Sequence, residues 1–319
     1  MTQHLTPSTA PVPPGLVQPD NSVTLSAVLS LTEGPAVDRE GNVYFSDIPR
    51  SRIMKLSASG ELGVFRENSG QANGNMFDRN GRLVTCEGEE FGPGGGRRVV
   101  RTDVETGEIT VLTDRFEGRR YNSPNDLCID TRGIIYFTDP RYADQTGREM
   151  DVEAVYRIDT DGGVKRILSQ PEIQKPNGIA ITPDDKTLYI VDSNGTVAGG
   201  NQKIWAFTLD DDGKPSDRRL VYDFAPGRGG DGIRLDRTGN LWIAAGVNAK
   251  REGRPGETLD VPTGVYVVTP NGELLGRIPI PEDILTNLTF GPPDDKTLYV
   301  TSGRNLYRIP LEVSGYVLR

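Results

Sequence analysis

The segment that decides the fold is Lys175-Pro176-Asn177-Gly178-Ile179-Ala180, which a polar turn connects to the apolar run Thr187-Leu188-Tyr189-Ile190-Val191-Asp192. The same arrangement recurs five times elsewhere in the chain: a polar residue opens a short apolar run, and a polar turn then leads to a second apolar run with an aromatic residue. The polar residue that opens each unit is called its anchor. The six anchors are Glu33, Asn73, Asn125, Asn177, Asp231 and Thr286.

Successive anchors are separated by 40, 52, 52, 54 and 55 residues. A repeat of about 50 residues that contains several short strands is typical of a β-propeller, in which each repeat forms one four-stranded blade around a central channel. Further strand pairs predicted at residues 52–65, 155–168 and 265–278 fit the outer half of such a blade. The sequence therefore predicts an all-β, six-bladed β-propeller.

The anchors occupy the same place in every repeat, so the fold should bring all six side chains to one end of the channel. Every anchor is polar, whereas a purely structural position at the entry to a buried strand would accept an apolar residue at least once. We interpret this ring as the functional site. In the alternative interpretation the Asn and Asp anchors only form turns, because Asn-Gly and Asp-Gly are common turn sequences.

The N-terminal part of the chain is expected to differ from the rest. Residues 1–20 are rich in Thr, Ser and Pro and predict a disordered or extended tail, which leaves residues 21–319 as one propeller domain. Residues 23–29 predict a strand before the first anchor. Because the last repeat has only three clear strands, this N-terminal strand is expected to complete the last blade and close the ring.

Composition limits the possible partners. The net charge of −9 is spread without a basic stripe, which argues against nucleic acid and favours a cation or a neutral small molecule. No apolar run reaches the roughly 20 residues that span a bilayer, and no signal peptide is visible at the N-terminus. We expect a soluble monomer or weak homo-oligomer with no membrane partner, cytoplasmic, or periplasmic or secreted if a leader has been removed.

The chain has one histidine, His4, in the predicted tail, and two cysteines, Cys86 and Cys128. This excludes catalytic triads and dyads that need a fixed imidazole, as well as zinc sites built from histidine or several cysteines. Both cysteines fall in or near apolar runs and are expected to be buried free thiols. Catalysis must then depend on carboxylates, amides, hydroxyls, Arg, Lys, Tyr or a metal bound through oxygen.

Four anchors form a ligand set made only of oxygen atoms. Glu33 and Asp231 supply two carboxylates, and Asn125 and Asn177 supply amide carbonyls. Such hard ligands, completed by water, are those that Ca²⁺ prefers, with Mg²⁺ as the second choice. The sequence therefore predicts one divalent cation at the channel mouth, most readily Ca²⁺, with Mg²⁺, Zn²⁺ or Mn²⁺ as alternatives.

Four long connections, at residues 87–97, 119–123, 140–153 and 245–263, lie where propeller loops shape a substrate mouth. The ring and these loops supply the candidate substrate-binding residues, which are Asn73, Glu87, Arg98, Asn125 and Tyr142.

Five short motifs resemble, in order, those of the gluconolactonase family, which is related to regucalcin (senescence marker protein) and more distantly to diisopropyl fluorophosphatase and the paraoxonases. They are Leu31-Thr32-Glu33-Gly34-Pro35, Asn122-Ser123-Pro124-Asn125-Asp126, Phe137-Thr138-Asp139-Pro140, Lys175-Pro176-Asn177-Gly178 and Asp231-Gly232. The resemblance covers the chain from about residue 21. It implies a six-bladed propeller with one divalent cation, usually calcium, and hydrolysis of sugar lactones. Glu33, Asn177 and Asp231 would be metal ligands, and Asn125 a ligand or a substrate contact.

Three departures from the family pattern affect what can be carried over. Ser123 stands where the regucalcin branch has an arginine, so the substrate preference of that branch is not transferred. Gly229-Gly230 precedes Asp231 where the family often has Pro-Asp-Gly, and Gly88 stands where many bacterial members have a histidine. Without a histidine near the site, the histidine-assisted chemistry of the paraoxonases is not expected.

The leading hypothesis is a metal-dependent lactonase in which the cation polarises the lactone carbonyl and Asp231 accepts a proton from the attacking water. Whether Asp231 or the cation activates the water stays open. Two alternatives also stay open: hydrolysis of another ester or a phosphotriester, and a non-catalytic propeller that binds a small molecule around a structural cation.

Overall fold

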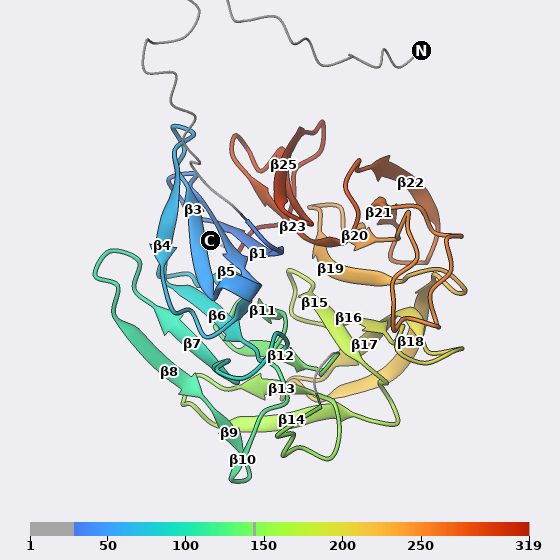
Figure 1. Cartoon of the computed structure of the whole chain (residues 1–319), viewed down its shortest axis with the longest axis horizontal. Helices are drawn as coiled ribbons and strands as arrows, with labels where there is room; N and C mark the ends of the chain where they lie inside the picture. Colours follow the sequence, from blue (N-terminus) through green and yellow to red (C-terminus); the bar gives the residue numbers. More distant parts are fainter. Residues whose placement is uncertain (1–28, 143–144, 319) are drawn as a thin grey trace, which may run out of the picture.

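The computed structural model describes residues 29–142 and 145–318, and within them six β-sheets surround a central channel like the blades of a propeller (Figure 1). The sequence-based prediction of an all-β, six-bladed propeller is confirmed. The predicted tail at residues 1–20 and residues 23–28 of the predicted closing strand lie outside the described residues. Within residues 29–142 and 145–318, the sixth blade has three strands.

Each blade is an antiparallel meander that begins at the channel. Blade one contains β1 (Thr32–Val37), β2 (Val43–Asp47), β3 (Arg52–Leu56) and β4 (Leu62–Arg66), with the 3-10 helix η1 (Ile48–Arg50) between β2 and β3. Blade two contains β5 (Ala72–Phe77), β6 (Leu83–Glu87), β7 (Arg98–Thr102) and β8 (Ile109–Thr113). Blade three contains β11 (Leu127–Ile129), β12 (Ile135–Asp139), β13 (Ala154–Ile158) and β14 (Val164–Ser169).

Blade four contains β15 (Pro176–Ile181), β16 (Thr187–Ser193), β17 (Gln202–Leu209) and β18 (Pro215–Asp223). Blade five contains β19 (Gly230–Leu235), β20 (Leu241–Ala245), β21 (Gly264–Val268) and β22 (Leu274–Pro279). Blade six contains β23 (Leu285–Gly291), β24 (Thr297–Ser302) and β25 (Asn305–Pro310). A separate hairpin, β9 (Arg115–Phe116) with β10 (Arg119–Arg120), projects between blades two and three.

The core lies between the blades. The second strands β2, β6, β12, β20 and β24 are buried along their whole length, whereas the outer strands β4, β8 and β22 are partly exposed. A strand with neighbouring blades on both faces must be apolar on both faces, which explains the aromatic-bearing apolar runs in the sequence. One such layer, between blades four and five, contains Val191, Ile204, Ile233 and Ile243. Cys86 and Cys128, which lie in other layers of the core, are buried free thiols, as expected.

The six inner strands contact one another in a closed ring. A β-bulge interrupts the pairing of β1, β5, β15, β19 and β23 with their second strands, at or beside the anchor. A bulge turns the side chains of the bulged strand away from the regular alternation and is frequent next to functional sites. In these five inner strands the bulge lies at the end of the strand that carries the anchor.

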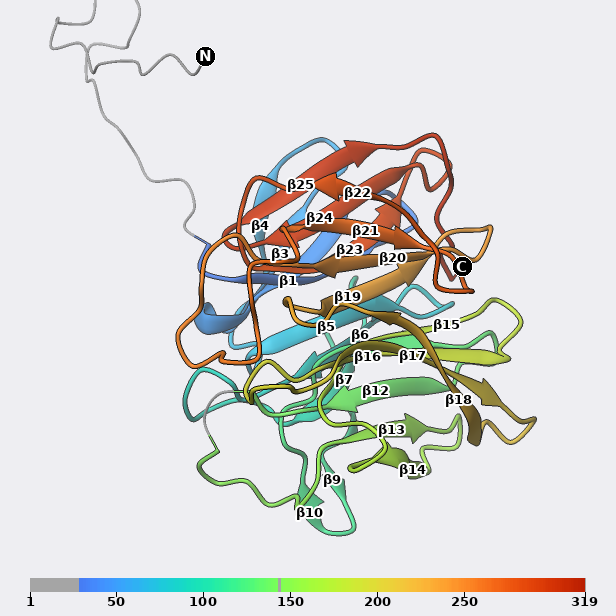
Figure 2. The same cartoon turned by 90° about the vertical axis from the view of Figure 1, so that its right-hand side faces the viewer.

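The C-terminal segment closes the opposite end of the channel. The N–H group of Tyr316 donates to the carbonyl of Leu235 in blade five at 2.8 Å, and Leu318 packs with Leu127 in blade three. In the side view the C-terminus lies at the end of the molecule opposite the long loops (Figure 2). The C-terminal segment and the anchors thus lie at opposite ends of the channel.

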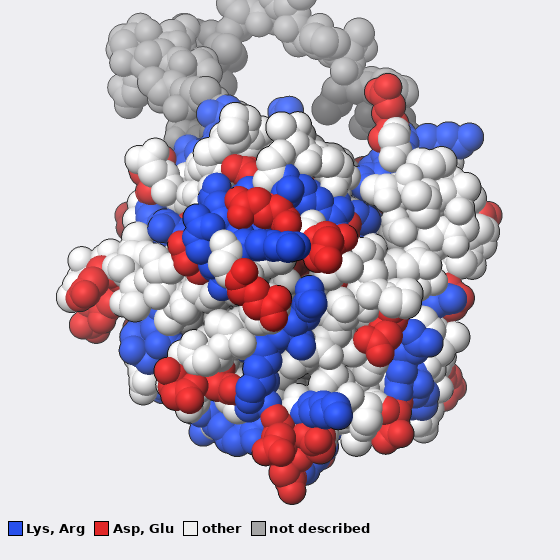
Figure 3. All heavy atoms as spheres, turned by 90° about the horizontal axis from the view of Figure 1, so that it is seen from below, with Lys and Arg blue, Asp and Glu red and all other residues white. Residues whose placement is uncertain are grey.

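The outer surface carries charges of both signs. Figure 3 shows the side from which the β9–β10 hairpin projects, and acidic and basic side chains are interspersed over it. Ion pairs near this hairpin join Arg115 to Glu149 at 3.9 Å and Arg119 to Asp151 at 3.8 Å. Within residues 29–142 and 145–318, no helix has the length and apolar character that crossing a membrane requires.

The size of the residue after the anchor limits how closely neighbouring inner strands approach, so a larger residue at Gly178 should lower the stability of the fold. A Cβ atom at Gly178 would lie 2.2 Å from the carbonyl oxygen of Asp231 and 3.0 Å from the Cα atom of Gly232. Both obstacles are backbone atoms and cannot rotate away. We expect Gly178→Ala to lower the free energy of unfolding by about 1–3 kcal/mol or more, measured by urea denaturation.

Gly276→Ala is the matched control, because Gly276 also lies within a strand, β22, and a Cβ atom there meets nothing within 4 Å. If the two variants were equally stable, the close approach of the inner strands would not limit the residue after the anchor.

Candidate active site

All six anchors line one cavity of about 200 Å³ at the loop end of the channel. Five of them lie in the first residues of the inner strands, and Asn125 lies two residues before the start of β11. Three of the long connections also contribute to the wall, through Glu90, Tyr142 and Arg254. The structure therefore brings together anchors that are up to 253 residues apart in the sequence.

Thr286 differs from the other anchors. Its hydroxyl donates to the carbonyl of Thr32 at 2.8 Å and also contacts Thr301. Since its hydroxyl joins blade six to blade one, Thr286 has a structural role in closing the ring, and the remaining five anchors are the candidates for chemistry.

Glu33 and Asp231 place two carboxylates in this cavity. Burial raises the pKa of Glu33 well above its usual range, and the carboxylates of Asp231 and Asp126 raise it further. Asn287 donates to Glu33 Oε2 at 3.0 Å, which opposes the shift in part. Burial also raises the pKa of Asp231, to about 6. Such a pair favours a bound positive charge, because each carboxylate is surrounded by too little water to screen the other.

The amide anchors leave acceptor atoms available. Asn73 Oδ1 and Asn125 Oδ1 are buried, and neither finds a hydrogen-bond partner within the described part of the chain. A buried carbonyl oxygen without a partner costs about 1–3 kcal/mol, so such atoms in a native structure point to a ligand or an ion. Asn177 lines the same cavity, and its side chain lowers the pKa of Asp231, which opposes the effect of burial in part.

Two carboxylates with amide oxygens differ from a histidine- or cysteine-rich metal site. No group of three or more His, Cys, Asp or Glu side chains suited to a metal occurs among the residues that the structure describes. The donors that converge on the cavity are oxygen atoms, which suit calcium or magnesium better than a soft metal.

Arg228 is a site residue that the sequence analysis missed. Its Nη2 atom donates to Asp231 Oδ2 at 2.5 Å, and its Nη1 atom donates to the carbonyls of Gly246 and Leu285 at 3.1 and 3.0 Å. Burial lowers the pKa of this guanidinium, while Asp231 opposes that shift. The signal available in the sequence was an arginine three residues before the anchor in a glycine-rich turn, Arg228-Gly229-Gly230-Asp231.

Tyr142 lies at the cavity wall, as the sequence analysis proposed for a substrate contact. Its hydroxyl is buried and has no hydrogen-bond partner in residues 29–142 and 145–318. Its backbone N–H donates to the carboxylate of Glu90 at 3.0 Å, and its ring lies 5.1 Å from Lys175 Nζ and 5.5 Å from Arg254 Cζ. These contacts fix the ring, so the hydroxyl is held in place for a ligand.

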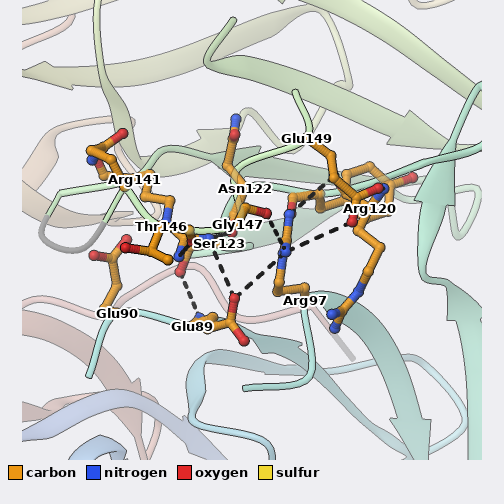
Figure 4. Close-up of polar contacts among 12 residues, drawn as sticks. Glu89, Glu90, Arg97, Arg120, Asn122, Ser123, Arg141, Thr146, Gly147 and Glu149 are labelled. Carbon is orange, nitrogen blue, oxygen red and sulfur yellow. Dashed lines mark hydrogen bonds and ion pairs between the residues drawn. The ribbon is translucent and has the colours of Figure 1, made fainter. Parts of the chain in front are cut away.

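Two buried arginines hold the loop that carries Tyr142 (Figure 4). Arg141 donates to the carbonyls of Asn122 and Thr146, both at 2.9 Å. Arg97 donates to the carbonyl of Tyr121 at 2.6 Å and to that of Gly147 at 2.9 Å.

The carboxylate of Glu89 lies between the two guanidinium groups, 3.4 Å from Arg141 and 3.6 Å from Arg97. Charged hydrogen bonds of this kind are the stronger ones in proteins. The wall of the cavity on this side is therefore preformed.

Glu87 and Arg98, also proposed as substrate contacts, do not line the cavity. They pair with each other, since Arg98 Nε donates to Glu87 Oε2 at 2.6 Å, and Arg66 pairs with the other carboxylate oxygen of Glu87. Glu87 is the last residue of β6 and is fully buried. The structure thus gives Glu87 internal partners on both oxygen atoms.

The same place at the end of the second strand holds a carboxylate in three other blades. Asp47 accepts the N–H groups of Ser30 and Leu31, Asp139 those of Asn122 and Ser123, and Asp192 those of Gln174 and Lys175. In each blade these N–H groups belong to the residues three and two positions before the anchor. The carboxylates therefore fix the segment from which the anchor projects.

A six-bladed propeller with a cavity of carboxylate, amide and hydroxyl groups at one mouth defines a class of small-molecule-binding or hydrolytic propellers. Residues 31–304 match the family described as SMP-30/Gluconolactonase/LRE-like region, and the chain belongs to this family. The family expected from the sequence motifs is thus confirmed.

Three relatives illustrate the similarity. The chain is 31% identical to a gluconolactonase from Zymomonas mobilis, over 91% of this chain and 81% of that protein. It is 31% identical to a 6-deoxy-6-sulfogluconolactonase from Pseudomonas putida, over 83% of this chain and 80% of that protein. A solved structure described as a gluconolactonase from Xanthomonas campestris superimposes with a TM-score of 0.72 at 32% identity, covering 89% of this chain and 87% of that one.

The repeated carboxylates generate a prediction at Asp139. The two carboxylate oxygens of Asp139 accept hydrogen bonds from the backbone N–H groups of Asn122 at 2.8 Å and Ser123 at 2.7 Å. Burial raises the pKa of Asp139 to about 7. In Asp139→Asn an amide NH₂ would face one of these donors. We expect a loss of about 1–3 kcal/mol in the free energy of unfolding, measured by chemical denaturation, compared with Asp114→Asn at an exposed position. Equal stability of the two variants would contradict this role.

Proposed function

We propose that this protein is a hydrolase that opens a sugar lactone, an aldonolactone such as glucono-1,5-lactone, with the help of one divalent cation. Membership of the family supports the reaction, and two relatives at 31% identity are named for hydrolysis of gluconolactone and of a sulfonated analogue. The observation that carries the proposal is the convergence of two carboxylates and three amides on one cavity.

Glu33, Asn125, Asn177 and Asp231 are the residues that would hold the cation. Two observations support these residues as ligands of a cation. The amide oxygen of Asn125 is buried and has no hydrogen-bond partner within the described residues. Burial and two neighbouring carboxylates raise the pKa of Glu33, which a bound cation would offset. Ca²⁺ suits this set best, and Mg²⁺, Mn²⁺ or Zn²⁺ are alternatives. When bound, the cation supplies Lewis-acid polarisation of the lactone carbonyl.

Asp231 is proposed as the base. Its carboxylate accepts a proton from the attacking water, whose oxygen adds to the lactone carbonyl carbon. When the bond between that carbon and the ring oxygen breaks, Asp231 returns the proton to the ring oxygen, which leaves as a hydroxyl. Arg228 is a positioning residue, because its 2.5 Å bond to Oδ2 fixes the orientation of the carboxylate.

Asn73 and Tyr142 are proposed as substrate contacts, together with Asn125. The unpartnered Oδ1 of Asn73 accepts a hydrogen bond from a sugar hydroxyl, and the Tyr142 hydroxyl both donates and accepts. Glu87 and Arg98 are proposed to act indirectly, by holding the second blade at the edge of the site.

The activity prediction concerns metal removal and Asp231. We expect hydrolysis of glucono-1,5-lactone by the purified protein, its loss on treatment with EDTA, and its recovery on adding Ca²⁺. Asp231→Asn should lower kcat at least about 100-fold, whereas Asp260→Asn, at an exposed carboxylate on the neighbouring loop, should leave kcat unchanged. A pH-stat assay records all of these rates.

The same assay on a panel of lactones, aryl esters and phosphotriesters decides between the alternatives. Hydrolysis that survives complete metal removal would refute the role of the cation. Preference for an ester or phosphotriester would change the bond that is broken, and no turnover of any compound would favour a binding propeller.

A stability prediction tests whether Glu33 is a metal ligand. Ca²⁺ at 100 times its dissociation constant should stabilise the wild type by about 2.7 kcal/mol. Glu33→Gln relieves the repulsion between the buried carboxylates but binds Ca²⁺ weakly, so its Tm should depend little on Ca²⁺. Thermal melts across a Ca²⁺ titration measure this, with Glu61→Gln at an exposed position as the control. If Glu33→Gln kept the calcium dependence of the wild type, Glu33 would not be a ligand.

A further inference from the structure

Among the described residues, three arginines line the cavity, and two of them are paired with a carboxylate. Arg228 is bound to Asp231, and Arg251 forms two bonds with Glu257, at 2.9 and 2.5 Å. Arg254 lies over the ring of Tyr142, with its Cζ atom 5.5 Å from the ring centroid. No carboxylate of the described residues forms an ion pair with the Arg254 guanidinium. Its positive charge is thus available to a ligand in the cavity.

The backbone around Arg254 is fixed, although the residue lies in the long connection at residues 245–263. The Arg254 carbonyl accepts the N–H group of Glu257 at 3.2 Å. Next to it, the N–H of Gly256 donates to the carbonyl of Gly195 at 3.2 Å, and that of Thr258 donates to the carbonyl of Pro226 at 3.1 Å. A Cβ atom at Gly195 would lie 2.2 Å from Glu257 Oε1, so the loop packs directly on blade four.

Tyr142 connects the Arg254 side of the cavity with the Asp231 side. Its ring lies beneath the Arg254 guanidinium. Tyr142 and Asp231 line the same cavity. Burial and, second, the negative charge of Asp231 raise the pKa of the Tyr142 hydroxyl well above its usual range. A molecule whose reactive carbon is at Asp231 would extend along the Tyr142 ring and bring its far end to Arg254.

We propose that the lactone hydrolysed at this site carries an anionic group at the end remote from its carbonyl, and that Arg254 binds this group. The group is a carboxylate, sulfonate or phosphate, because a guanidinium offers two parallel N–H donors that match the oxygen atoms of such anions. A neutral sugar would leave the Arg254 guanidinium without an ion-pair partner among the described residues. The inference rests on the proposed lactonase function and specifies its substrate class.

Steady-state hydrolysis of three lactones of one sugar tests the inference: glucono-1,5-lactone, its 6-phosphate and 6-deoxy-6-sulfoglucono-1,5-lactone. We expect kcat/KM to be at least about tenfold higher for one or both anionic lactones, as one charged hydrogen-bonded pair provides. The better anionic lactone identifies the group. Arg254→Gln should remove the preference through KM, lowering kcat/KM for the anionic lactones at least about tenfold more than for the neutral lactone.

Lys250→Gln is the matched control, because Lys250 is an exposed cation on the same connection and does not line the cavity. It should leave all three rates unchanged. If the neutral lactone reacted as well as the anionic ones, or if Arg254→Gln lowered all rates equally, the anion inference would be wrong while the lactonase function stood.

A binding measurement separates the inference from the reaction. Calorimetric titration compares gluconate, which has one carboxylate, with glucarate, which has a second carboxylate at the far end. Tighter binding of glucarate by about tenfold, lost in Arg254→Gln, supports the anion site even if no lactone is turned over. Equal affinity for gluconate and glucarate in the wild type would overturn it.

Discussion

The close approach of the six inner strands around the channel is the constraint on which the site depends. The residue after the anchor is glycine in four blades, and a Cβ atom at Gly34, Gly178 or Gly232 would lie within 2.2 Å of an atom in the neighbouring blade. The other two blades have Asp126 and Asn287 there, and Asn287 fills the space that Gly232 leaves. The packing that closes the ring therefore also places a carboxylate and an amide beneath the anchors.

This arrangement explains the electrostatics of the cavity floor. Asn287 donates to Glu33 at 3.0 Å and to Asp126 at 3.2 Å, and Arg234 reaches Asp126 at 3.3 Å. The guanidinium groups of Arg234 and Arg228 thus face three carboxylates. Those of Glu33 and Asp126 are buried, and that of Asp231 is partly buried. Burying a charge without a partner is costly, so the surplus of negative charge favours a cation at the mouth. The metal hypothesis thus follows from the packing of the channel as well as from the ligand types.

The sequence predicted the parts of the molecule that repeat. The anchors and the apolar runs recur in every unit, so the blade number, the core strands and the convergence of Glu33, Asn177 and Asp231 on one cavity could be inferred without coordinates. Glu87 was assigned to the mouth because it begins a long loop, although it ends a second strand as Asp47 and Asp139 do. That comparison of equivalent positions was the signal for its internal contacts. The predicted closing strand at residues 23–29 stays a prediction.

Arg251 and Arg254 could not be assigned from the repeat, because their connection between β20 and β21 is longer than the equivalent connections of the other blades. Arg228 lies three residues before its anchor, where no other blade has an arginine. The positions of these arginines depend on contacts outside the repeat. Glu257 packs against Gly195 of another loop, and Arg228 donates to the carbonyl of Leu285 at the start of β23. The ring, whose geometry the repeat fixes, provides the groups for chemistry, whereas the loops provide charges that one sequence can change without disturbing the blades. Because buried arginines such as Arg97 and Arg141 already anchor the Tyr142 loop, little ordering entropy would be lost on binding. Differences in substrate among proteins with this ring should therefore arise from the identity of side chains on fixed loops.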